Sequence, residues 1–186
     1  PGSIVSSNTS GIPIHSMLEE RSTDFKTHFL GTHFFNPPRY LELLEIIPTP
    51  NTDPTIVDFL MNFGDRHLGK TTVLCKDTPA FIANRVGVGG ILGLFHLVEK
   101  RNLSVETIDK LTGPIIGRPK SATFRTCDVV GLDTLVHVAK GLYNNCETDE
   151  VRDSFKLPTY VQQLFDNKWL GDKTKQGFYK KTKDEK

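Results

Sequence analysis

One histidine and one glutamate stand in neighbouring apolar segments, in positions where they could act together on a proton. His33 lies near the end of the β-type run 29–35, and Glu45 lies inside the next run, 41–47. A carboxylate beside an imidazole fixes the tautomer of the ring and stabilises the imidazolium that forms when the ring accepts a proton. An unpaired carboxylate among aliphatic neighbours is costly, so Glu45 needs a buried partner, and His33 is the nearest candidate. The pattern favours general acid–base chemistry.

Each candidate also has a plainer interpretation. A lone histidine at a strand end is more often a core residue, and Asn84 can simply cap the long helix that starts beside it. Ser10 closes Ser-Asn-Thr-Ser, which is also ordinary turn chemistry. His28 and His33 lack the spacing of a metal-binding pair, so no metal site is expected.

Composition excludes several classes of protein. The 186 residues carry 23 Lys and Arg against 22 Asp and Glu, so no surplus of positive charge attracts a nucleic acid. Three widely spaced cysteines indicate reduced thiols rather than a disulfide framework. The longest apolar run, 86–98, is shorter than the roughly 20 residues of a membrane span, and no signal peptide is visible. We expect a soluble, cytoplasmic protein with no nucleic-acid or membrane partner.

The first part of the chain has the pattern of an α/β unit. Segments 3–8, 29–35, 41–47 and 71–75 resemble strands, and Asp53-Pro54 opens a helix that Gly69 closes. We expect an open parallel sheet, which would leave a bare edge. The chain is therefore predicted to be the C-terminal part of something longer, or to pair with a missing half.

The character changes near Pro79, after which no strand is predicted. Segment 81–101 forms one long helix that is apolar on most faces, which predicts burial on all sides in a bundle or a subunit interface. Ser104 and Asp133 are expected to cap two further helices. The predicted fold is thus α/β plus all-α. Residues 1–78 are expected to form a partial Rossmann-like sheet that has only the C-terminal strands of such a domain. Residues 79–186 are expected to form a helical dimerisation domain.

Six ordered blocks spread along the chain resemble the L-3-hydroxyacyl-CoA dehydrogenases, and especially the dehydrogenase region of bacterial fatty-acid β-oxidation proteins. The blocks are Ser7-Asn8-Thr9-Ser10, His33-Phe34-Phe35-Asn36-Pro37, Leu44-Glu45-Ile46-Ile47, Lys76-Asp77-Thr78-Pro79-Ala80-Phe81-Ile82-Ala83-Asn84-Arg85, Val130-Gly131-Leu132-Asp133 and Gly177-Phe178-Tyr179. That family oxidises the 3-hydroxyl of an acyl-CoA thioester with NAD, between a Rossmann domain and a helical domain that dimerises.

The resemblance assigns roles to individual residues. His33 would be the general base and Glu45 its orienting partner, while Ser10 and Asn84 would hydrogen-bond the reacting oxygen or the thioester carbonyl. Ser10, Asn36 and Lys173 would contact the NAD cofactor. The resemblance also implies an acyl-CoA substrate and a homodimer.

The family's glycine-rich loop has no clear counterpart, because Gly87-Val88-Gly89-Gly90 lies inside a helical run with no preceding strand. We therefore expect the N-terminal NAD-binding half to be missing. Two hypotheses stay open: a fragment of the dehydrogenase, or a non-catalytic acyl-CoA-binding or dimerisation module of the same ancestry.

Overall fold

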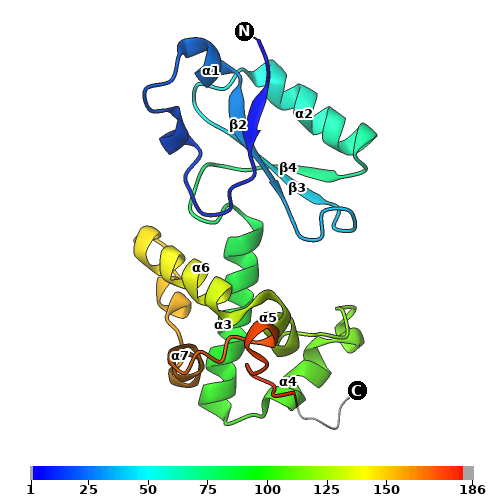
Figure 1. Cartoon of the computed structure of the whole chain (residues 1–186), viewed down its shortest axis with the longest axis vertical. Coiled ribbons are helices and arrows are strands. Elements are labelled where there is room, and N and C mark those ends of the chain that lie inside the picture. Colours follow the sequence, from blue (N-terminus) through cyan, green and yellow to red (C-terminus); the bar gives the residue numbers. More distant parts are fainter. Residues whose placement is uncertain (1, 182–186) are drawn as a thin grey trace. The chain divides into compact units, whose positions relative to one another are not determined.

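The computed structural model describes residues 2–181 and divides the chain into two compact units. One unit ends at Asn84 and the other begins at Arg85. The first holds every strand of the described chain, and the second is helical (Figure 1). No helix of the described residues is long and apolar enough to cross a membrane.

The sheet of the first unit has four strands in the order β1-β2-β3-β4. Their bounds are Val5–Ser7, Phe29–Phe34, Leu43–Pro48 and Thr71–Leu74. β1 and β2 are parallel, as are β3 and β4, but β2 and β3 are antiparallel. The expectation of a parallel sheet is therefore wrong. The short connection between β2 and β3 explains the mixed sheet, since a parallel crossover needs about a dozen residues or more.

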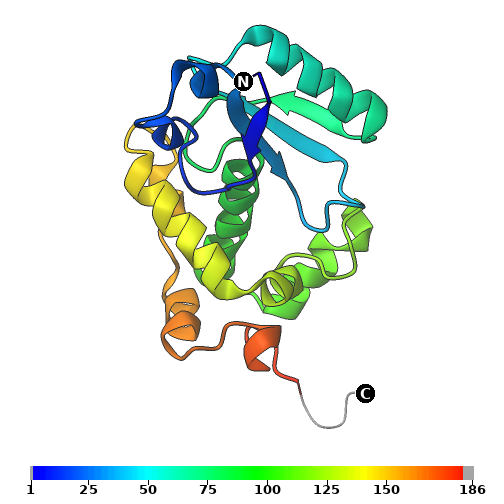
Figure 2. The ribbon, with the colours of Figure 1, turned by 45° about the horizontal axis from the view of Figure 1, so that its top comes forward.

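Helix α2 (Pro54–His67) covers one face of the sheet, and the short helices η1 (His15–Leu18) and α1 (Thr23–Thr27) cover the other (Figure 2). The start of α2 is as predicted, because the Asp53 side chain accepts a hydrogen bond from the Thr55 N–H and Pro54 occupies the first turn. Gly69, with φ of +61°, follows the helix as expected.

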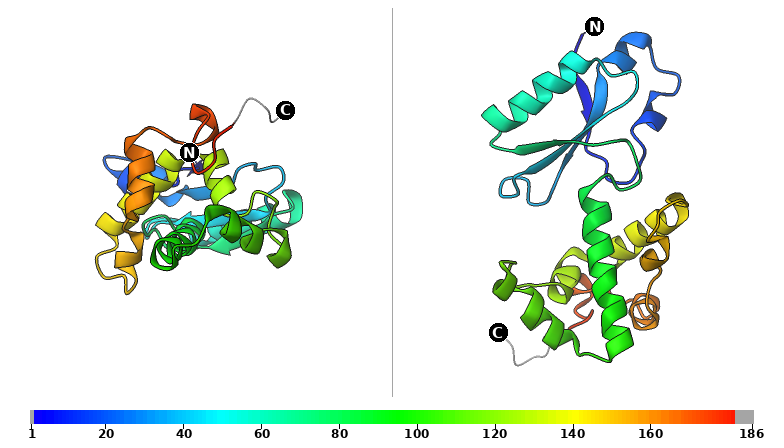
Figure 3. Two further views of the ribbon diagram at one scale, coloured as in Figure 1. Left: turned by 90° about the horizontal axis from the view of Figure 1, so that it is seen from below. Right: turned by 180° about the vertical axis from the view of Figure 1, so that it is seen from behind.

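The second unit is built around α3 (Ala83–Arg101), the long helix seen from behind in Figure 3, whose first two residues belong to the first unit. The remaining helices of this unit are shorter than α3. They are α4 (Val105–Thr112), η2 (Pro114–Ile116), α5 (Phe124–Val130), α6 (Leu132–Asn145), η3 (Arg152–Phe155), α7 (Thr159–Asp166) and η4 (Asp172–Thr174).

α3 buries one stripe, Val88, Leu92, Phe95 and Val98, while Val86 is 70% exposed in the single chain, so burial of the other faces in a subunit interface stays a prediction. The structure corrects the prediction for Asp133. Gly131 rather than Asp133 precedes the first turn of α6, and the Asp133 carboxylate pairs instead with the Lys173 ammonium. Ser104 caps α4 as predicted, by accepting a hydrogen bond from the Thr107 N–H.

Two aspartates connect distant segments of the second unit. Asp109 accepts hydrogen bonds from the N–H groups of Thr123, Phe124 and Arg125 at the start of α5. Asp128 accepts the N–H groups of Phe178 and Tyr179. The block Gly177-Phe178-Tyr179 is therefore explained by local structure.

Candidate active site

His33 and Glu45 face each other directly across the antiparallel pair β2–β3. Cross-strand partners in such a pair project from the same face of the sheet, so the register brings the two side chains together. The His33 Nδ1 lies 2.7 Å from the Glu45 Oε2, and the residues are only 5% and 1% exposed. This is the contact that a carboxylate needs in order to hold the imidazole in one tautomer.

The second carboxylate oxygen of Glu45 is also occupied. Oε1 accepts the backbone N–H groups of Ile82 and Ala83 at 3.0 and 2.8 Å. Burial alone would raise the pKa of the Glu45 carboxyl, but the hydrogen bonds from His33, Ala83 and Ile82 together hold that pKa below its ordinary value. Glu45 is therefore charged at neutral pH despite its burial.

The imidazole of His33 lies between two aromatic rings, with one nitrogen left free. Its centroid is 4.5 Å from that of Phe35 and 5.5 Å from that of Phe81. Within the described part of the chain, Nε2 has no hydrogen-bond partner and no unpaired side-chain nitrogen or oxygen is fully buried. Nε2 therefore keeps contact with solvent, where it can meet a substrate proton.

Ser10 and Asn36 lie after the carboxyl ends of the parallel strands β1 and β2, and both are exposed. The Asn8 Oδ1 accepts the Phe34 N–H at 2.8 Å and so connects the two strand ends. Ligands of open α/β sheets bind outside the carboxyl ends of parallel strands. Exposed polar side chains at this edge fit a dinucleotide such as NAD.

Asn84 and Lys173 occupy different units. Asn84 is the second residue of α3 and directly follows Ala83, whose N–H binds Glu45, so the backbone places it beside the His33–Glu45 pair. Lys173 belongs to η4 in the second unit, where its ammonium pairs with Asp133.

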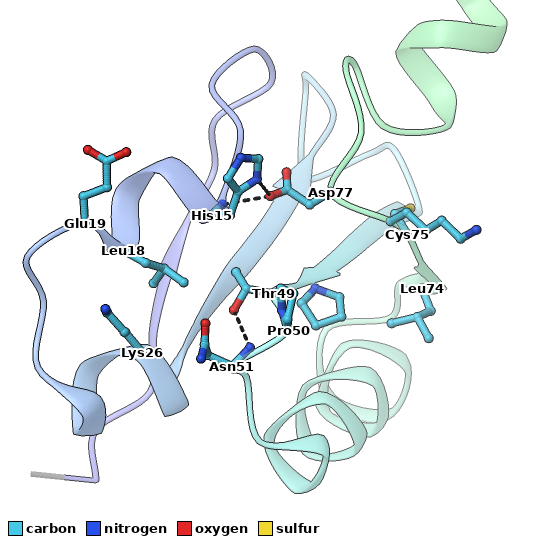
Figure 4. Close-up of a pocket in the computed structure, with 12 residues that line it drawn as sticks. His15, Leu18, Glu19, Lys26, Thr49, Pro50, Asn51, Leu74, Cys75 and Asp77 are labelled. Atoms are coloured by element: carbon cyan, nitrogen blue, oxygen red, sulfur yellow. Dashed lines mark hydrogen bonds and ion pairs between the residues drawn. The ribbon is translucent and has the colours of Figure 1, made fainter. Parts of the chain in front are cut away.

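A separate cavity of ≈ 1000 Å³ opens on the first unit, beside η1 and the ends of β3 and β4 (Figure 4). Its lining includes His15, Lys26, Thr49 and Asp77. None of the predicted site residues lines it.

All three cysteines are buried and unbridged, as expected of structural thiols. Burial raises the pKa of both the Cys75 and Cys127 thiols to about 12, which makes either a poor nucleophile.

The sequence did not point to the surroundings of His33. Phe35 and Phe81 contact the ring, and the Asp77 carboxylate accepts the N–H groups of Ile14 and His15. Asp77 stands two residues before Pro79, in a position typical of a turn. This turn was the only feature of the segment that the sequence could indicate.

Two family models match the chain. Residues 1–78 match "3-hydroxyacyl-CoA dehydrogenase, NAD binding domain", and residues 81–181 match "3-hydroxyacyl-CoA dehydrogenase, C-terminal domain". The first match corrects the expectation that the NAD-binding half is missing, because NAD-binding-domain sequence is recognised from residue 1 onward.

Curated relatives agree with these models. The chain is 56% identical over 180 residues to a "Probable 3-hydroxyacyl-CoA dehydrogenase" of Bacillus subtilis, with 97% of this chain and 23% of that protein covered. It is 50% identical over 183 residues to a protein of the same description from Deinococcus radiodurans, covering 98% of this chain and 52% of the relative. The chain thus spans between about a quarter and about half of these relatives.

The fold is also similar to solved structures. The (S)-3-hydroxybutyryl-CoA dehydrogenase of Ralstonia eutropha matches with a TM-score of 0.84 and 28% identity, over 97% of this chain and 61% of that one.

Proposed function

The chain belongs to the 3-hydroxyacyl-CoA dehydrogenase family, and from that premise we propose that it takes part in oxidising a 3-hydroxyacyl-CoA to the 3-ketoacyl-CoA with NAD, as in fatty-acid β-oxidation. One observation carries the proposal. A buried carboxylate binds Nδ1 of His33 at 2.7 Å, while Nε2 has no partner among the described residues. A general base needs this combination of a fixed tautomer and an open lone pair.

Each site residue has a separate role in the proposed reaction. Nε2 of His33 takes the proton of the 3-hydroxyl, and the Glu45 carboxylate stabilises the imidazolium that results. Ser10 and Asn84 donate hydrogen bonds to the substrate oxygen, where negative charge grows as the proton leaves. Bound NAD would supply the hydride acceptor for C3, the carbon that carries this hydroxyl.

Residues 1–78 belong to a Rossmann-like NAD-binding domain, in which Ser10 and Asn36 contact the cofactor. Residues 79–186 belong to the helical dehydrogenase and dimerisation domain, in which Lys173 is the proposed cofactor contact. The protein acts as a cytoplasmic homodimer.

Substrate discrimination tests this function. NADH consumption is followed at 340 nm with acetoacetyl-CoA and, as the matched control, with acetoacetate that lacks the CoA moiety. We expect turnover of the thioester and little of the free acid. If NADH is not consumed while acetoacetyl-CoA still binds, the non-catalytic acyl-CoA-binding module becomes the better account.

A further inference from the structure

We infer that Phe81 is a positioning residue for His33, held against the imidazole by a left-handed turn whose two ends are pinned by carboxylates. The inference deepens the proposed function, on which it rests, because it explains what holds the imidazole in place. The turn runs from Asp77 to Ala83.

Asp77 pins the first end of the turn. Its carboxylate accepts the N–H group of Ile14 at 2.9 Å. It also accepts the N–H group of His15 at 2.8 Å and lies 2.6 Å from Nδ1 of the same residue (Figure 4). These contacts join the segment after β4 to the start of η1, some sixty residues earlier in the chain.

Glu45 pins the other end, through the N–H groups of Ile82 and Ala83. The same carboxylate binds His33, so the turn and the imidazole share one anchor. The Phe81 N–H closes the turn by donating to the Thr78 carbonyl at 3.0 Å.

The backbone between the two anchors is strained. Ala80 and Phe81 have φ values of +60° and +51°, in the left-handed region that non-glycine residues avoid. Two successive residues keep this conformation only where surrounding contacts hold the backbone in place. Such strained conformations are most common at functional sites.

The strained turn places the aromatic ring of Phe81 against His33. Phe81 is 4% exposed, and its ring lies 5.5 Å from the imidazole, tilted by 58°. Phe35 contacts the same imidazole at 4.5 Å, with the planes at 63°. Two rings and one carboxylate therefore restrict the His33 ring plane, so that Nε2 keeps one direction.

Phe29 provides a matched control. It is also 4% exposed and belongs to the same core cluster as Phe81, but its recorded ring partner is Phe25, at 5.0 Å. Phe29→Leu and Phe81→Leu remove equivalent apolar volume from one core, and only Phe81→Leu removes a ring that contacts His33.

The experiment compares these variants by ¹⁵N spectra of the histidine imidazoles and by steady-state kinetics on the same chain. Wild type and Phe29→Leu should show His33 as one tautomer, protonated at Nδ1. Phe81→Leu should keep this tautomer, because Glu45 still binds Nδ1, but its His33 signals should broaden because the ring plane is no longer fixed. Its kcat should fall roughly 10- to 100-fold with little change in KM. If a Leu variant does not fold, Phe81→Met and Phe29→Met repeat the comparison with a bulkier side chain.

A Phe81 variant with the wild-type His33 spectrum and the kcat of its Phe29 counterpart would overturn the inference. The spectra need no turnover. Absence of activity in wild type would therefore count against the proposed function alone, and the spectra would still decide the role of Phe81.

Discussion

At the scale of single residues, the proposed chemistry depends on the His33–Glu45 pair. Glu45 remains charged in a buried position because three donors satisfy it: the imidazole and two backbone N–H groups. A buried carboxylate without such partners would be costly. The charge of the Glu45 side chain therefore matters more for its contact with His33 than its size does.

Replacing Glu45 by Gln tests this point. The Gln amide can donate a hydrogen bond to Nδ1, which moves the ring proton to Nε2 and blocks that nitrogen from accepting the substrate proton. We expect kcat to fall by about 10²- to 10⁴-fold with KM little changed. Glu19→Gln, an exposed change in the same unit, should behave as wild type. Equal kcat values in the two variants would remove the orienting role of Glu45.

The lowered pKa of Glu45 also predicts a pH dependence of stability. Because the folded state holds the pKa of this carboxyl below its ordinary value, its contribution is present above the ordinary value and is lost as pH falls through the folded value. Urea unfolding at several pH values should show wild type and Glu45→Gln converging in stability from about pH 5 downward. A difference that grows toward acid pH would contradict the assignment.

The pairing of His33 with Glu45 could be predicted from sequence, because apolar neighbours around a carboxylate imply a buried partner. The part played by Phe81 could not. Neither Ala80 nor Phe81 favours the left-handed backbone that brings the ring to His33, so local preference points away from the observed turn.

At the scale of elements, the sequence predicted the ends of helices correctly where a capping residue determines them. Asp53 stands before the start of α2 and Gly69 after its end, as predicted, and Ser104 caps α4. The apolar composition of α3 does not tell which of its faces the neighbouring helices cover. Within one chain the buried stripe is Val88, Leu92, Phe95 and Val98. The antiparallel pairing of β2 with β3 was missed, although the short connection between them indicated it.

Gly177 shows how one element can depend on the absence of a side chain. A Cβ at this position would lie 2.0 Å from the Asp128 Oδ1, and that carboxylate is held by the N–H groups of Phe178 and Tyr179. Gly177→Ala should therefore destabilise the chain by about 2–3 kcal/mol in urea unfolding, as overpacked sites do.

Gly141 is the matched control for Gly177. It lies inside α6 with open space around its Cβ position, so Gly141→Ala should raise the free energy of unfolding by about 1 kcal/mol through helix propensity. If both alanines had the same effect, the close contact at Asp128 would not be what requires glycine at 177.

At the scale of the whole molecule, α3 keeps one face uncovered. Val86 and Leu97 are 70% and 40% exposed, and the Cβ positions of Gly90 and Gly93 meet open space. The spacing 86, 90, 93, 97 places these residues on one side of the helix. A second copy of the chain packed on this side would bury them, which is the basis of the proposed homodimer.

Light scattering tests the homodimer directly. We expect twice the chain mass of 20.9 kDa for wild type. Gly93→Glu adds charge to the uncovered face and should reduce the mass to that of one chain. A wild-type monomer at concentrations well above those of the activity assay would rule out this association.

In the proposed function, His33 is the general base of a 3-hydroxyacyl-CoA dehydrogenase. The most direct measurement is NADH consumption with acetoacetyl-CoA by wild type, by His33→Ala and by His67→Ala, which changes an exposed histidine of the same unit. The account predicts a loss of about 10²- to 10⁴-fold in kcat for His33→Ala alone, with the fold intact. Turnover by His33→Ala at the rate of His67→Ala would contradict it.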